Sequence, residues 1–242
     1  MGIIRRQSIR ASFLLYLGAA IGFFTKVLVF PNFLSSAEVG LSNLLVTNAM
    51  LLAQFAAVGF SSMTLRFFPY FQDKSRRHHD FLSVLLTVPA VGFLVVMLLV
   101  VIFQQPLMEH FQQNSPLIVE YFWYLMPLTL ATLYFDLLDA YLRSLQKTVV
   151  PVLFREVIQR LLVLLCIFLY AVGWLDFQQF VTLYVGLLSS ITVMMVVYIA
   201  WLGHFRLRMR RGWRMRKLLR RIIVFGGFTL LGNIAVNTIY TI

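Results

Sequence analysis

Long apolar runs separated by short polar connections organise this chain. Each run approaches or exceeds the roughly 20 helical residues needed to cross a hydrocarbon core about 30 Å thick. The runs are predicted to be helices because none alternates with a period of two, as a membrane β-barrel strand would. The predicted spans are 9–31, 39–65, 81–103, 117–142, 149–173 and 177–203, and a seventh begins near residue 221. The pattern predicts an all-α polytopic membrane protein.

Composition supports the same class. Hydrophobic residues make up 60% of the 242 residues and charged residues only 12%, whereas about a quarter of an average soluble domain is charged. The mean hydropathy is +0.84. These values exclude a soluble globular protein and a disordered chain.

The basic residues are distributed unevenly between the connections. Of the 21 Lys and Arg residues, 18 lie in the N-terminal tail or in the second, fourth and sixth connections, and the other three connections contain none. The positive-inside rule therefore places the N-terminus and the even-numbered connections in the cytoplasm. The formal net charge of +12 is then explained by topology and by contact with anionic membrane lipids, so no nucleic-acid partner is expected.

The predicted spans divide the chain into three parts. Residues 1–203 form a six-helix N-terminal transmembrane lobe, and 204–220 form a basic cytoplasmic connection. Residues 221–242 form a seventh transmembrane helix. Because this last run has no polar tail, we expect it to be the first helix of a truncated second lobe, so that the chain is a fragment of a larger transporter.

Three bases and three acids inside the predicted spans are singled out, because an ionisable residue there costs roughly 2.5–3.5 kcal/mol on insertion scales unless it faces a cavity or a partner. They are the bases Lys26, Arg155 and Arg160 and the acids Asp136, Asp139 and Glu156. Spans four and five are predicted to form a hairpin that turns near Lys147. Folding the chain there brings Asp139 near Arg155 and Glu156, and Asp136 near Arg160.

Two interpretations of these charges remain open. In the first, they form structural ion pairs, and Lys26 extends to the outer headgroups. In the second, the bases line a cavity for an anionic headgroup, which the planar fork of arginine suits, and a carboxylate is available to a coupling proton or sodium ion. Asn43 and Asn48 are further candidates for lining that cavity or bonding across helices.

No arrangement typical of an enzyme is found, and no catalytic residue is assigned. The histidines His78, His79, His110 and His204 lack the spacing of metal ligands, and Cys166 has no histidine nearby in the sequence. The chain also lacks the G-x-x-x-x-G-K-[ST] motif of a P-loop. We expect no cofactor and no metal, and any transport would be driven by an ion gradient, a substrate gradient or a partner.

Three segments suggest a family. Residues 38–41 (EVGL), 59–71 (GFSSMTLRFFPYF) and 141–151 (YLRSLQKTVVP) resemble the bacterial oligosaccharide flippases, which are polysaccharide-biosynthesis membrane proteins of the multidrug/oligosaccharidyl-lipid/polysaccharide exporter superfamily. The resemblance covers the whole chain, which corresponds to the first six-helix lobe and the start of the second.

The resemblance implies a function. Such a protein moves a lipid-linked oligosaccharide, usually on undecaprenyl pyrophosphate, across the bacterial inner membrane for capsule, lipopolysaccharide O-antigen or exopolysaccharide export. Lys26 would be the basic residue of the first span in a central cavity. Arg66, Arg143, Arg155 and Arg160 would contact the pyrophosphate at the cytoplasmic mouth. Polysaccharide polymerase machinery would be a partner.

Other functions remain open. A lipid II flippase or a cation-coupled drug antiporter of the same superfamily fits the same topology. A membrane polysaccharide polymerase or ligase belongs to a different class and would need a large outer loop carrying catalytic Arg or His. The predicted outer connections are short and contain no Lys or Arg, which favours a transporter over an enzyme. A non-transporting membrane scaffold is a third class.

Overall fold

The computed structural model describes residues 2–57, 59–67, 79–114 and 116–203, and within these ranges it contains helices and no strand. The helices, in chain order, are α1 (Gly2–Phe23), the π-helix η1 (Phe24–Val29), α2 (Phe30–Phe33), α3 (Ser36–Ala57), α4 (Phe60–Phe67), α5 (His79–Ile102), α6 (Gln104–Asn114), α7 (Pro116–Glu120), the 3-10 helix η3 (Phe122–Tyr124), α8 (Leu125–Ser144), α9 (Val149–Val152), the π-helix η4 (Leu153–Ile158), α10 (Gln159–Ala171) and α11 (Phe177–Trp201). The predicted all-α class is confirmed.

Five helical segments are long and apolar enough to cross a membrane. They are Arg5–Phe33, Ser36–Ala57, Leu85–Ile102, Phe122–Ser144 and Phe177–Trp201, and they correspond to the first four predicted spans and the sixth. The predicted connection 204–220 and the predicted seventh span 221–242 lie outside the described residues.

The fifth predicted span, 149–173, is a continuous helix over Val149–Ala171, made of α9, η4 and α10. Every window of 18 residues inside this helix contains Arg155, Glu156 and Arg160. Each of the five segments above contains an 18-residue window with at most two charged residues, so the three charges of this helix, and not its length, set it apart from them. This composition predicts that the charged side chains face other helices rather than lipid.

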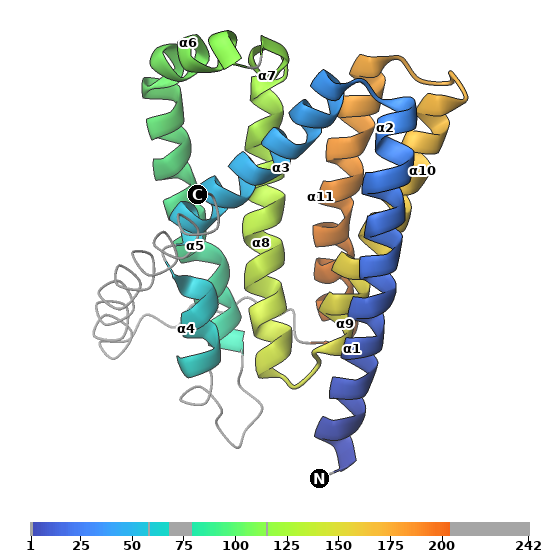
Figure 1. The fold of residues 1–242 in the computed structure, drawn as a ribbon. Helices are drawn as coiled ribbons and strands as arrows, with labels where there is room; N and C mark the ends of the chain where they lie inside the picture. Colours follow the sequence, from blue (N-terminus) through green and yellow to red (C-terminus); the bar gives the residue numbers. More distant parts are fainter. Residues whose placement is uncertain (1, 58, 68–78, 115, 204–242) are drawn as a thin grey trace.

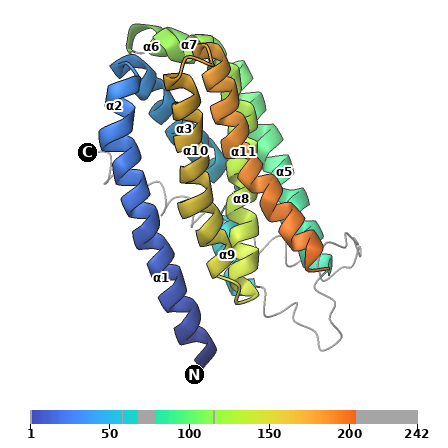
Figure 2. The same ribbon diagram turned by 90° about the vertical axis from the view of Figure 1, so that its right-hand side faces the viewer.

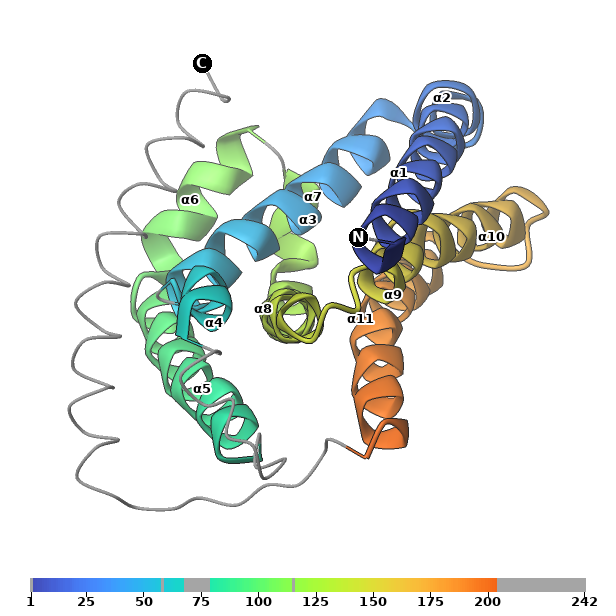
Figure 3. The same cartoon turned by 90° about the horizontal axis from the view of Figure 1, so that it is seen from below.

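Helix α8 stands at the centre of the bundle (Figures 1 and 3). Helices α4 and α5 lie on one side of it, α1, α9 and α11 lie on the other, and α3 crosses it diagonally. Helices α1, α10 and α11 run alongside one another at the outer edge of the second group (Figure 2). The central position explains why α8 is the most buried of the five candidate spans.

The two ends of the bundle carry alternate connections. The N-terminus of α1 and the turn between α8 and α9 lie at one end, and the junction of α2 with α3 lies at the other, together with α6 and α7 (Figure 1). This alternation agrees with the predicted order of connections. The assignment of the first end to the cytoplasm stays a prediction from the positive-inside rule.

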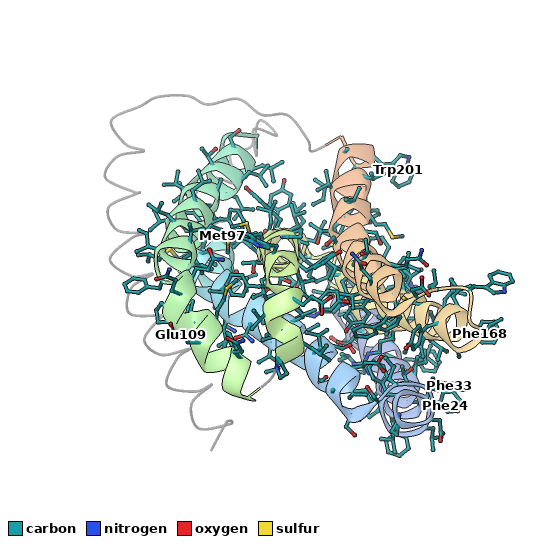
Figure 4. The ribbon with its side chains drawn as sticks, turned by 90° about the horizontal axis from the view of Figure 1, so that it is seen from above. Phe24, Phe33, Met97, Glu109, Phe168 and Trp201 are labelled. Carbon is teal, nitrogen blue, oxygen red and sulfur yellow. The ribbon has the colours of Figure 1, made fainter. Side chains whose placement is uncertain are left out.

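The apolar side chains are divided between the inside and the outside of the bundle. One buried cluster joins α4 and α5 to the later halves of α8 and α11, and the other joins α2 and α7 to α10 and the first half of α11. Many large apolar side chains are nevertheless exposed, among them Phe13, Leu94, Phe168 and Trp201, and Trp201 projects outward from α11 (Figure 4). Extensive exposed apolar surface is typical of a face that contacts lipid.

Two predicted boundaries differ from the structure. The predicted span 39–65 is divided between α3 and α4, and Gly59 between them has a φ of +72°, a conformation that glycine adopts without steric cost. Residues 104–114, predicted as part of a connection, form α6, which lies across the end of the bundle (Figure 1). Pro106 is tolerated there because it falls in the first turn, where its missing N–H has no intrahelical partner.

Candidate functional site: a basic cavity beside α1 and η4

A half-open polar cavity of about 360 Å³ lies between helices of the α1–α2, α3, η4–α10 and α11 segments. The polar side chains that line it are those of Thr25, Lys26, Asn43, Arg155, Glu156, Gln159, Arg160 and Tyr184. Four of the eight predicted site residues, Lys26, Arg155, Glu156 and Arg160, are therefore gathered around one cavity.

Both helices that supply the charged residues change to π-helix at this level. Lys26 lies in η1, and Arg155 and Glu156 lie in η4. A π-helical turn is rare and frequently marks a functional site, because it replaces regular i→i−4 hydrogen bonds and changes the direction of the side chains. Sequence pattern did not predict either segment.

Arg155 forms the ion pair that joins the two arms of the α8–α9 hairpin. Its Nη1 atom lies 3.0 Å from Oδ1 of Asp136 in α8. Its guanidinium carbon also lies 5.5 Å from the centroid of the Phe135 ring, which is within the range of a cation–π contact. The side chains of Arg155 and Asp136 are 38% and 34% exposed, and Arg155 also lines the cavity.

Arg160 connects α10 to the first helix. One of its terminal nitrogens pairs with the Glu156 carboxylate one turn earlier, and the other donates a hydrogen bond to the main-chain carbonyl of Gly18. Gly22 lies against the same guanidinium, and a Cβ atom at that position would overlap it. The two glycines of α1 thus provide the space in which Arg160 reaches the main chain.

Lys26 differs from the two arginines. It is exposed at the cavity, and none of the carboxylates that the structure describes forms an ion pair with it. Its position in the lining favours the cavity-facing interpretation. Lys26, Arg155 and Arg160 line the cavity with one carboxylate, that of Glu156. When Asp136, the partner of Arg155 from outside the cavity, is also counted, a formal excess of one positive charge remains.

Two of the predicted residues, Arg143 and Asp139, lie outside the cavity. Arg143 pairs with Asp139 one turn earlier on α8, at 2.6 Å, and neither residue lines the cavity. Arg66 belongs to α4, and its side chain lies outside the part of the chain that the structure describes.

The partner predicted for Asp136 across the hairpin was wrong by five residues. Asp136 contacts Arg155 rather than Arg160, and Asp139 contacts Arg143 rather than Arg155 or Glu156. The cause is the turn. Gln146 adopts a φ of +60°, and the Lys147 N–H bonds to the carbonyl of Leu142 at 2.9 Å, which is the 6→1 bond of a Schellman motif. The hairpin therefore turns before Lys147.

Some lining residues were not anticipated. Gln159 and Tyr184 line the cavity without any sequence signal that distinguishes them from other polar residues in apolar spans. The contact of α1 with η4 had a usable signal, because Gly18 and Gly22 form a G-x-x-x-G pair, which lets membrane helices approach closely. Within the described residues, no group of three or more His, Cys, Asp and Glu side chains is placed to hold a metal ion.

Comparison with known proteins assigns the chain to no family. No family model, no curated protein and no solved structure matches the chain. Fold and site define an all-α membrane protein with a basic cavity between its helices. Its function must be inferred from that cavity.

Proposed function

We propose that this protein is a flippase that moves a lipid-linked oligosaccharide of the undecaprenyl-pyrophosphate type across the bacterial inner membrane. The observation that carries the proposal is the half-open cavity with its excess positive charge, set between helices of membrane-spanning length. A sugar–pyrophosphate headgroup crosses hydrocarbon only if its polar groups find partners, because each uncompensated group costs several kcal/mol. The cavity offers such partners along the path.

The charges favour an anionic substrate. Arg155 and Arg160 present guanidinium groups, which make bidentate contacts with phosphate, and Lys26 adds an ammonium group with no carboxylate partner among the described residues. A cationic drug would be repelled by this excess of positive charge. A diphosphate headgroup, from a lipid-linked oligosaccharide or from lipid II, is therefore favoured over the cationic substrate of a drug antiporter.

An apolar groove next to the cavity suits the lipid tail. The groove has a volume of about 430 Å³ and lies between the η1–α2 segment and α10. Its lining includes Phe24, Phe33 and Phe168, which point to one outer edge of the bundle (Figure 4). Because η1 and α10 border both spaces, a headgroup in the cavity would have its prenyl tail in the groove and in the surrounding lipid. Polysaccharide polymerase machinery would then receive the flipped substrate on the far side.

The test is transport in proteoliposomes. A fluorescent polyprenyl-diphosphate oligosaccharide is placed in the vesicles, and its arrival in the outer leaflet is followed by dithionite quenching, with and without a proton or sodium gradient. Lys26→Gln should slow flipping about tenfold or more, since it removes a charge-assisted hydrogen bond. Insertion and folding should be unchanged.

The matched control is Lys147→Gln. Lys147 lies at the hairpin turn with its Nζ atom 6.0 Å from the Tyr198 ring, and it does not line the cavity. Equal flipping by Lys26→Gln and the unaltered protein would show that Lys26 only extends to the headgroups. No flipping by the unaltered protein under any gradient would reject the proposal.

A further inference from the structure

A second, smaller pocket adjoins the basic cavity. It has a volume of about 50 Å³, enough for a small ion or a few waters, and Thr132 and Asp136 of α8 and Thr192 of α11 line it. The two spaces share the wall formed by Val46, Met50, Arg155, Gln159 and Leu188. Arg155 is the charged member of this wall.

Arg155 therefore has two anionic partners available to it. In this structure it faces the small pocket and pairs with Asp136 at 3.0 Å. The same residue lines the large cavity, where the proposed function places a diphosphate. A guanidinium that turns to a diphosphate gives up at least part of its contact with the carboxylate, because its donors are fixed in one plane.

The small pocket is suited to a cation once Arg155 has turned away. The hydroxyl of Thr132 already donates its hydrogen to the carbonyl of Leu128, and that of Thr192 donates to Ala131, both at 2.8 Å. Each of these oxygens retains lone pairs that can only accept. Without Arg155, the Asp136 carboxylate would be left beside oxygen acceptors, which favours a proton or a small metal cation.

No other described charge in the pocket would replace Arg155. The residues that α3 and α11 contribute are uncharged: Val46, Met50, Leu188, Ile191 and Thr192. On α8 itself, Asp139 and Arg143 also act on Asp136, but their formal charges oppose each other because they form an ion pair. Glu156 of η4 lies in the large cavity and pairs with Arg160.

We propose that Arg155 couples the two pockets: an anion that binds in the large cavity draws Arg155 from Asp136, and a small monovalent cation, a proton or a sodium ion, takes its place at Asp136. The inference rests on the proposed function for its anion. It goes further by naming the residue that takes the cation and the residue that links the two events. Anion and cation then stabilise each other's binding, as linkage requires.

The experiment measures binding of inorganic pyrophosphate to the purified chain in lipid nanodiscs by calorimetry. One series raises sodium against choline at constant ionic strength and pH, and a second lowers the pH at constant sodium. Binding should become about three- to tenfold tighter in the series that supplies the cation, which is the range for a partly exposed ion pair. Comparison with variants at each pH removes the contribution of pyrophosphate's own protonation.

Asp136→Asn is the decisive variant. It should bind pyrophosphate about three- to tenfold more tightly than the unaltered chain, and its affinity should depend on neither cation. Thr132→Val should weaken the response to sodium and leave the response to pH unchanged, which separates the two cations. Asp139→Asn, the matched control outside both pockets, should retain the cation dependence.

The outcomes are distinct. If pyrophosphate binds but Asp136→Asn binds it equally or less tightly while retaining its helical content, the coupling is wrong and the anion site stands. If the affinity of the unaltered chain is independent of both cations, the coupling is also wrong. If pyrophosphate binds neither the unaltered chain nor Asp136→Asn, both the coupling and the proposed function are refuted.

Discussion

Helix α1 passes η4 at Gly18 with no room for a side chain. A Cβ atom at this position would lie 2.6 Å from the carbonyl oxygen of Glu156 and 2.7 Å from its Cβ atom. Carbon atoms in contact normally lie 3.5–4.0 Å apart. Because the carbonyl belongs to the main chain, no rotamer change relieves the overlap, and Gly18→Ala must separate the two helices by roughly 1 Å.

The expected cost follows from two opposing contributions. Overpacking of this kind costs about 1–3 kcal/mol, and replacing glycine by alanine inside a helix gains about 1 kcal/mol. Two other glycines isolate the second contribution. Gly40 in α3 and Gly186 in α11 have no atom within 4 Å of an added Cβ. Gly18→Ala should therefore be less stable than Gly40→Ala or Gly186→Ala by about 1–3 kcal/mol.

Gly22→Ala separates the effect of helix packing on stability from the effect of Arg160 on anion binding. Its added Cβ would overlap the guanidinium of Arg160, which is the end of a flexible side chain, so the helices need not separate. The free energy of unfolding should fall less than for Gly18→Ala. Arg160 would nevertheless leave the carbonyl of Gly18, so pyrophosphate binding should change even where stability does not.

The assay is unfolding by SDS in mixed micelles, followed by circular dichroism, for all four alanine variants. The free energies of unfolding are compared at the same SDS mole fraction, which avoids a long extrapolation. If Gly18→Ala is as stable as Gly186→Ala, the close approach of α1 and η4 is wrong. The cavity between these helices, which depends on this close approach, would then be wrong as well.

Two further predictions use the same assay. Reversing one charge of the Asp136–Arg155 pair, as Asp136→Arg or Arg155→Asp, should lower the free energy of unfolding by about 1 kcal/mol. In a double-mutant cycle the double reversal should recover most of that loss. No recovery would show that the two residues do not pair. Gln146→Gly should raise the free energy of unfolding by about 0.5–1 kcal/mol, because Gln146 has a φ of +60° that glycine adopts more easily. A loss of stability would contradict this turn geometry.

The sequence was sufficient for the helical class and for most of the spans, because the hydropathy of a membrane helix is a local property of its own residues. The same reasoning predicted the α8–α9 hairpin. It failed on the partners within the hairpin, because these depend on where the chain turns. A left-handed conformation at Gln146, which is not a glycine, left no signal in the sequence, and it moved the pairing of Asp136 from Arg160 to Arg155.

The charged residues could be chosen from the sequence, but their grouping could not. Lys26, Arg155 and Arg160 stood out as bases inside apolar spans. Whether they share a cavity depends on contact between α1 and the η4–α10 segment, which are far apart in the chain. Arg143 shows the opposite case. The family resemblance grouped it with the cavity residues, but it forms an ion pair with Asp139 outside the cavity.

The π-helix η1 explains how Gly18 of α1 and Phe30 of α2 come to lie on one face of the first helical segment. In a regular α-helix each residue turns about 100°, so Phe30 would lie about 120° around the axis from Gly18. The extra residue that a π-helical stretch accommodates removes about 100° of this rotation and returns Phe30 to within about 20° of the Gly18 face. Phe30 is indeed buried and lines the cavity. The π-helical segment thus places two features on one face of the helix: the contact of Gly18 with η4, and the wall of the cavity at Phe30. Lys26 lies between them along the chain.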